Sequence, residues 1–157
     1  MSTTWVSTHR LQGFSPTLDF HPVSDAPTVL VASRDTEISD SLADVLEPYA
    51  LNAVWVKGLA DAKTWLATGK IAACLCGFSL TEGSYRDLVK QAKHERSEIP
   101  VIIVSTPGCT NEYREYLSAM NTGAFDFLCH PYRRLELERT LRLAITTYGR
   151  AARKDYA

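Results

Sequence analysis

The residues that could do chemistry in this chain stand where five short apolar segments end. In chain order they are Ser33, Arg34, Gly77, Ser105 and His130. Parallel strands bring their carboxyl ends to one edge of a sheet, so these side chains are expected to meet there. Hard divalent cations prefer carboxylate oxygens, and none of the five positions carries one. The sequence therefore predicts no metal site of this kind at that edge.

The sheet itself is predicted from five segments that are short and rich in apolar or β-branched residues. They are Thr28–Ala32, Ala53–Val56, Ile71–Cys76, Val101–Val104 and Phe125–Leu128. Between them, apolar residues recur every three or four positions, which is typical of helices with one buried face. This alternation predicts an α/β fold: a doubly wound, five-stranded parallel sheet of the flavodoxin-like (βα)5 kind, with helices on both faces.

Apolar spacing and end signals place five helices between and after the strands. They cover about residues 38–49, 60–66, 84–94, 113–122 and 133–148. Ser84 is the expected N-cap of the third helix. Gly69 and Gly123 are the expected stops of the second and fourth. The last helix carries its apolar residues at Leu135, Leu137, Leu141, Leu143 and Ile145.

Length, composition and charge fit one water-soluble domain. The chain has 157 residues, of which 45% are hydrophobic and 22% charged, with a formal net charge of -1. The near-neutral charge gives no reason to expect direct nucleic-acid or membrane binding. No apolar run approaches the roughly 18 residues of a membrane span. The start lacks the pattern of a signal peptide, so a cytoplasmic location is expected.

Three parts are predicted along the chain. Residues 1–26 form an irregular N-terminal extension that is polar and interrupted by Pro16 and Pro22. Residues 27–149 form the folded domain, and residues 150–157 form a short basic tail. The tail is too short to argue for DNA contact, because each neutralised phosphate adds only one increment of affinity.

The four cysteines have two interpretations. Cys74, Cys76, Cys109 and Cys129 lie in or beside predicted strands, so reduced core thiols are expected. Zinc could instead take Cys76, Cys109, Cys129 and His130, all near the carboxyl edge of the sheet. Neighbours in a strand point to opposite faces, however, so Cys129 and His130 cannot readily hold one ion. We therefore expect no metal.

Three stretches resemble the receiver domain of bacterial response regulators. They are Pro27-Thr-Val-Leu-Val-Ala-Ser-Arg-Asp, Pro100-Val-Ile-Ile-Val-Ser-Thr and Gly123-Ala-Phe-Asp-Phe-Leu-Cys-His-Pro-Tyr. The resemblance covers about residues 27–148. The resemblance implies a two-component or phosphorelay protein. The chemistry of that family uses an acidic pair, an aspartyl phosphate acceptor, a Thr or Ser, and a Lys.

Matched to the family pattern, most of those positions are altered. Ser33 and Arg34 stand at the acidic pair, and Gly77, or Cys76 in another register, stands at the acceptor. Ser105 matches the Thr or Ser, while His130 replaces the Lys. Glycine has no side chain to phosphorylate, and an arginine places a fixed positive charge where a cation would sit. The resemblance therefore implies an atypical pseudo-receiver.

Two polar residues at this edge have alternative interpretations. Arg34 could pair with Asp35 or Glu82, or it could point into solvent. His130 could titrate near neutrality, or it could be a tolerated polar residue. Residual phosphorylation of Asp35 is a further alternative, although the rest of the coordination set is missing.

The resemblance also implies a surface for partner proteins, formed by the fourth helix, fifth strand and fifth helix. The candidate interface residues are Tyr113, Tyr116, Tyr132 and Tyr148, and Phe127 stands at the position of the family's switch aromatic. We expect a non-enzymatic, phosphorylation-independent domain without a cofactor. It would bind another signalling protein (a kinase, regulator or output protein) or form a homodimer. The alternative is a small-molecule sensor with a ligand in the vacated crevice and Phe78 as an apolar wall.

Overall fold

The computed structural model describes residues 5–8, 27–47, 49, 51–95, 98–106, 108 and 111–155. The main sheet contains β1 (Trp5–Thr8), β2 (Thr28–Ala32), β3 (Asn52–Val56), β4 (Ile71–Cys76), β7 (Val101–Val104) and β8 (Asp126–Leu128). The helices are α1 (Thr36–Leu46), α2 (Leu59–Ala67), α3 (Tyr85–His94), α4 (Glu112–Thr122) and α5 (Arg134–Asp155). A separate pair of short strands, β5 (Ser79–Leu80) and β6 (Gly83–Ser84), follows β4.

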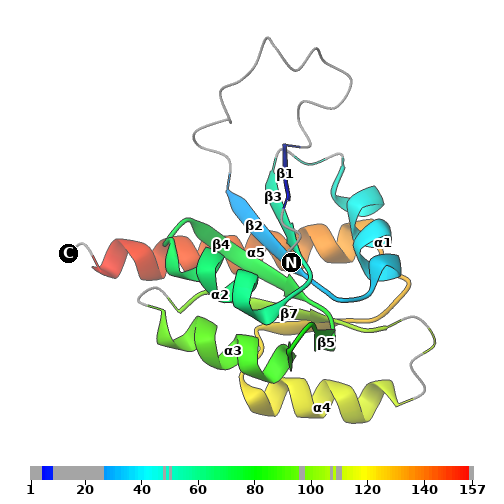
Figure 1. Cartoon of the computed structure of the whole chain (residues 1–157). Coiled ribbons are helices and arrows are strands. Elements are labelled where there is room, and N and C mark those ends of the chain that lie inside the picture. Colours follow the sequence, from blue (N-terminus) through cyan, green and yellow to red (C-terminus); the bar gives the residue numbers. More distant parts are fainter. Residues whose placement is uncertain are drawn as a thin grey trace.

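The doubly wound parallel sheet is confirmed. The strand order is β1-β3-β2-β4-β7-β8, and every neighbouring pair from β3 to β8 is parallel. Helices cover both faces (Figure 1). The predicted segments 28–32, 71–76 and 101–104 agree with β2, β4 and β7, while β3 begins one residue earlier and β8 one residue later. The chain thus brings the ends of β2, β4 and β7 to a common edge.

The prediction of an irregular N-terminal extension is wrong for Trp5–Thr8. These residues form β1, which pairs antiparallel with β3 and adds a sixth strand to the sheet (Figure 1). Four residues are too few for a periodic pattern to emerge. The partner strand also lies more than forty positions later in the chain, so local signals could not reveal the pairing.

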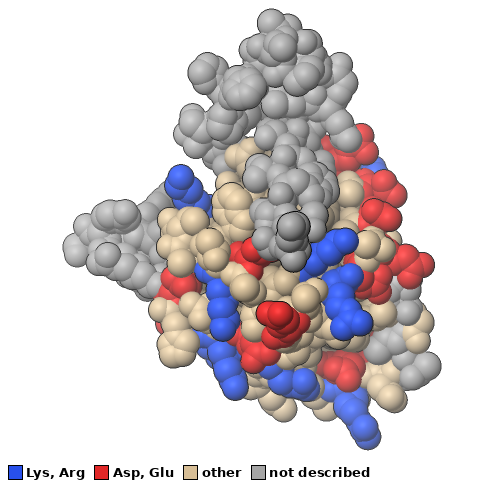
Figure 2. Space-filling model, viewed as in Figure 1, with Lys and Arg blue, Asp and Glu red and all other residues tan. Residues whose placement is uncertain are grey.

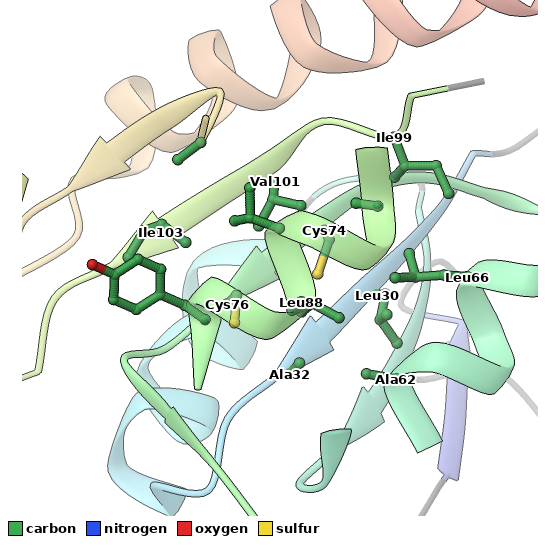
Figure 3. Close-up of a cluster of buried hydrophobic side chains, with 14 of the residues drawn as sticks. Leu30, Ala32, Ala62, Leu66, Cys74, Cys76, Leu88, Ile99, Val101 and Ile103 are labelled. Carbon is green, nitrogen blue, oxygen red and sulfur yellow. The ribbon is translucent and has the colours of Figure 1, made fainter. Parts of the chain in front are cut away.

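Two buried layers flank the sheet. On one face, alternate residues of the strands pack against α2, α3 and α4, and Figure 3 shows Leu66 and Leu88 reaching toward this layer. On the other face, α1 and α5 bury Leu42, Leu137 and Leu141 against the sheet. Because side chains alternate along a strand, the strands β2, β3, β4, β7 and β8 each contribute to both layers. The central strands therefore consist of continuous apolar runs, as expected for a sheet covered on both sides.

The helix ends follow the predicted signals. The Ser84 side chain caps α3, and the Asp87 carboxylate accepts a hydrogen bond from the Ser84 backbone N–H at 3.0 Å. Gly123 ends α4 with φ 110°, a left-handed conformation that glycine adopts without a Cβ penalty. Ser84 therefore marks the start of α3, and Gly123 marks the end of α4.

Replacing Ser84 with alanine removes one half of this capping box. We expect the free energy of unfolding to fall by about 1 kcal/mol, as for other N-cap losses. Urea unfolding of Ser84→Ala beside Ser79→Ala, an exposed serine outside any helix cap, measures the difference. Equal stability of the two variants would contradict a capping role for Ser84.

Helix α5 differs from its prediction in length and in the face it buries. It continues to Asp155, so the predicted basic tail is helical over most of its length. Leu137, Leu141 and Ala144 face the core, whereas Leu135 and Leu143 are 73% and 60% exposed.

Over the described residues, no helix combines the length and apolar character that crossing a bilayer requires.

Candidate functional site

Three of the predicted site residues directly follow strands, and each adds one backbone hydrogen bond to the sheet. The backbone N–H of Ser33 donates to Val56 O, that of Gly77 to Ala32 O, and that of Ser105 to Leu128 O, at 2.8 to 3.0 Å. All three residues are buried. The ends of β2, β4 and β7 therefore meet at one edge, as the sequence predicts.

Gly77 faces a space that Ser33 already fills. A Cβ atom built on Gly77 would lie 2.8 Å from Ser33 Oγ and 3.3 Å from Ile38 Cδ1. The Ser33 hydroxyl is held in place, because it accepts a hydrogen bond from the Asp35 backbone N–H at 3.0 Å. Any side chain at position 77 would have to displace this serine.

An open crevice of about 350 Å³ lies beside these residues. Its lining consists of Ser33, Arg34, Asp35, Ile38, Phe78, Ser79 and Thr106. Phe78 forms part of the wall, as the sequence predicts. Ser105 does not face the crevice but lies fully buried behind it, and its neighbour Thr106 lines the wall instead.

The segment after β4 folds back over the same edge, a feature that the sequence analysis missed. Strands β5 and β6 form a hairpin, and Glu82 at its tip has φ 66°. Backbone bonds tie the hairpin down: Arg34 N donates to Ser79 O, and Thr81 exchanges bonds with Lys57 and Leu59 at 2.9 to 3.0 Å. Ser84, the predicted N-cap of a helix, thus also belongs to the second strand of this hairpin.

Arg34 points into solvent. Within the described part of the chain, its side chain forms no ion pair, so of the two alternatives for Arg34 the structure favours solvent exposure over pairing with Asp35 or Glu82. The Asp35 carboxylate instead accepts a hydrogen bond from the Glu37 backbone N–H at 2.9 Å and caps α1. Capping satisfies that carboxylate locally and leaves Arg34 free to be hydrated.

Ser105, His130 and Tyr132 form a connected group beneath the edge. Ser105 Oγ accepts a hydrogen bond from the His130 backbone N–H at 2.7 Å, and the Tyr132 hydroxyl donates to Ser105 O at 2.6 Å. The His130 and Tyr132 rings meet edge-on. Tyr132 is only 8% exposed, so its prediction as an interface residue is wrong. Its phenol makes a buried hydrogen bond that links the segment after β8 to the segment after β7.

Replacing Tyr132 with phenylalanine should reduce the free energy of unfolding by about 1 to 2 kcal/mol, because the buried Ser105 carbonyl loses a donor. Burial first, and then the charges of Asp35 and Cys129, raise the pKa of Tyr132 above its usual value of about 10. The folded state therefore keeps a proton that the unfolded chain releases, and this contribution is lost as pH rises above about 10.

Urea unfolding of wild type and Tyr132→Phe at neutral pH and near pH 11 measures both effects. The stability difference should shrink or reverse at the higher pH. Tyr113→Phe is the matched control, because Tyr113 is 75% exposed. A difference that is independent of pH would contradict the raised pKa.

The cysteines divide by burial. Burial raises the pKa of the Cys74 and Cys76 thiols, so both remain protonated inside the apolar layer of α2 and α3. Cys129 is exposed, which corrects its prediction as a core thiol. Cys109 lies outside the described residues. Across the residues that are described, no three His, Cys, Asp or Glu side chains are grouped as metal ligands.

An aromatic stack connects the crevice to the outer surface of α4. Phe127 is 6% exposed and lies between Phe78 and Tyr116, with ring centroids 6.0 Å from each. Tyr116, Tyr113 and Leu117 are exposed on one face of α4, which we call the tyrosine face. The side chain of Tyr148, another predicted interface residue, lies outside the described residues.

Surface charge is uneven around the molecule. Helix α1 carries Glu37, Asp40 and Asp44 on its exposed side and has no basic residue. Figure 2 shows acidic side chains gathered where α1 lies, whereas acidic and basic side chains are mixed over α2 and α3. The visible face therefore carries no extended basic patch of the kind that binds nucleic acid.

No protein-family model matches this chain. A curated relative, the swarming motility regulation protein RssB of Serratia marcescens, is 26% identical over 109 residues. The match covers 69% of this chain and 48% of that protein, so the chain spans about half the length of this relative.

Solved structures of receiver domains share the fold. A signal receiver domain of an HD domain-containing protein from Pseudomonas fluorescens Pf-5 has a TM-score of 0.72 at 18% identity, over 87% of this chain and 98% of that one. The receiver domain of the sensor histidine kinase PA1611 from Pseudomonas aeruginosa PAO1 has a TM-score of 0.66 at 18% identity, over 77% and 98%. That domain holds a magnesium ion in its active site cleft. The five parallel strands and their flanking helices thus have the flavodoxin-like fold of response-regulator receiver domains.

Proposed function

We propose that this chain is a pseudo-receiver: a signal-transduction domain that works without phosphorylation and acts by binding another protein. The receiver fold and the similarity to RssB support a role in two-component signalling. The partner would be another signalling protein, such as a kinase, a regulator or an output protein. A cytoplasmic location and the absence of enzymatic activity belong to the same proposal.

The observation that carries this proposal is the filled space at Gly77. The acceptor position has no side chain, and the Ser33 hydroxyl occupies the volume that a side chain would need. Phosphoryl transfer to a carboxylate also depends on metal ions that neutralise charge at the transferring group. Ser33 and the solvent-exposed Arg34 provide no carboxylate for such an ion.

Incubation with magnesium and acetyl phosphate, or with beryllofluoride, tests phosphorylation independence. Intact mass and melting temperature are measured, with a typical receiver domain as the positive control. We expect neither a mass adduct nor a shift in melting temperature. An adduct would overturn the proposal, and peptide mapping would show whether it lies on Asp35, the alternative acceptor.

The tyrosine face supports the protein-binding part of the proposal. Tyr113 is 75% exposed, Tyr116 39% and Leu117 43%, and they lie three and four residues apart on one helix face. Exposed aromatic residues supply rigid apolar contact area in interfaces. If the tyrosine face and α5 together form a homodimer interface, light scattering at high concentration will show a dimer. The double variant Tyr113→Ser, Leu117→Ser should then disrupt this dimer. A wild-type monomer at high concentration would exclude the homodimer and leave a heteromeric partner.

The crevice supports a second candidate function, the sensing of a small molecule. Its volume of about 350 Å³ is within the range of ligand pockets, and Phe78 and Ile38 give it an apolar side. A ligand that binds only the native state raises the melting temperature by mass action. A panel of nucleotides, quinones and metabolites tests this function, and a shift that Phe78→Ala abolishes would favour it over protein binding alone.

A further inference from the structure

Strand β1 is an edge strand of the main sheet and has β3 as its neighbour (Figure 1). The two strands run antiparallel, in a register that extends from Trp5 opposite Trp55 to Thr8 opposite Asn52. A segment that pairs in this way is held through backbone hydrogen bonds, while its side chains decide how well it fits. The edge of β3 is therefore a binding surface for an extended strand.

Strand β3 depends on a partner at this edge. All of its residues are buried, and Val54, Trp55 and Val56 are 1%, 4% and 2% exposed. Without a neighbouring strand, the backbone donors and acceptors along this edge would be open to pairing with any other chain. The edge must therefore be covered by β1 or by a strand equivalent to it.

The connection from β1 to β2 is much longer than the gap that it has to cross. Thr8 and Thr28 both stand beside Asn52, on opposite sides of β3. The gap between them is two strand spacings, or about 10 Å. Residues 9–27 make this connection, and roughly twenty extended residues can span up to about 65 Å. Such a length allows β1 to reach the β3 edge of its own copy or of a second copy.

We propose that the β3 edge is an interface between two copies of this chain, which exchange their β1 strands. The second copy is the occupant because its β1 carries the same residues, Trp5-Val-Ser-Thr, and can form the same register. The paired residues are identical in the two arrangements. The protein concentration, relative to the effective concentration of the tethered strand, therefore decides between them. Reciprocal exchange closes a two-fold symmetric dimer.

Disulfide trapping between two different single variants tests this exchange. Ser7 lies opposite Ala53, and opposite residues of an antiparallel pair have Cα atoms about 4.5 to 5.5 Å apart, a distance that a disulfide can span. One sample carries Ser7→Cys and the other Ala53→Cys, both with Cys109 and Cys129 replaced by serine. After mixing and mild oxidation, we expect a covalent heterodimer on non-reducing gels. Its yield should rise with concentration up to about 1 mM, the order of effective concentration that a flexible tether provides.

Two further samples serve as controls. Ser7→Cys mixed with Ser79→Cys reports random collision, because Ser79 is exposed and lies outside the main sheet, and its yield should stay well below that of the matched pair. One chain with both Ser7→Cys and Ala53→Cys should close an internal disulfide in dilute solution, which verifies the register. Circular dichroism verifies folding. If Ala53→Cys does not fold, Thr8→Cys with Asn52→Cys replaces the pair.

The proposal is overturned if the single chain closes its disulfide while the mixed variants form no heterodimer, or if Ser79→Cys gives an equal yield. A single chain that does not close would remove the register on which the proposal rests, and would overturn it as well. Adding Tyr113→Ser and Leu117→Ser to both samples should leave the yield unchanged. A lost heterodimer in that background would assign the contact to the tyrosine face instead. The exchange and the proposed use of the tyrosine face can thus fail independently.

Discussion

Gly77→Asp is expected to destabilise the protein by about 3 to 5 kcal/mol, the usual cost of an uncompensated charge in a buried position. The new Cβ would lie 2.8 Å from Ser33 Oγ, and that hydroxyl is held by the Asp35 backbone N–H. The carboxylate would lack the further carboxylates of a metal site, and Arg34, the basic residue on the crevice wall, is exposed to solvent. Restoring the acceptor residue alone should therefore restore no phosphorylation.

Urea unfolding at neutral pH measures the loss, and two variants separate its causes. Gly77→Ala adds only the Cβ and should cost about 1 to 3 kcal/mol through overpacking. Ser79→Asp adds the same charge to an exposed position on the crevice wall and should cost little. Wild-type stability of Gly77→Asp, or an aspartyl phosphate formed on it, would show that the site can still accept a side chain.

Phe127→Ala is expected to lower the free energy of unfolding by about 3 to 5 kcal/mol, the usual range when a buried phenylalanine is truncated. The ring is 6% exposed and lies between Phe78 and Tyr116, so its removal leaves a cavity and two rings without their partner. The lost contacts come from both the crevice wall and α4. No single neighbour can therefore collapse into the space.

Phe125→Ala is the comparison that isolates this effect. Phe125 is only partly buried and packs on the opposite layer, so its truncation should cost clearly less. The urea midpoints can be compared directly if the slope of each transition is unchanged. Equal losses for the two variants would contradict the central position of Phe127 in the stack.

The sequence predicted the sheet and most helix ends because those signals are local. Continuous apolar runs marked β2, β4 and β7, and Ser84 and Gly123 marked caps whose geometry depends on a few adjacent residues. Spacing was less informative for α5, where Leu135 and Leu143 share the apolar character of Leu137 but point outward. Residue type alone could not distinguish the leucines that face the core from those that face solvent.

The candidate site was predicted in position but not in its contacts. The arrangement of Ser33, Gly77 and Ser105 at one edge follows from the topology, whereas their orientation depends on which atoms satisfy which hydrogen bonds. Tyr132 is buried because its hydroxyl reaches Ser105 O, a partner 27 residues away that no periodicity reveals. Arg34 remains in solvent because Asp35 is used in capping α1.

Because β1 pairs with β3, β1 and β8 are the described edge strands at which another molecule could add a strand to this sheet. An uncovered edge strand offers a row of backbone donors and acceptors on which a foreign strand can assemble. Here β1, four residues long, is the edge strand on the β3 side, and it runs antiparallel to the other strands. Of the described strands, β8 is left at the opposite margin, and it is only three residues long. Such a sheet offers little template for fibrous growth in either direction.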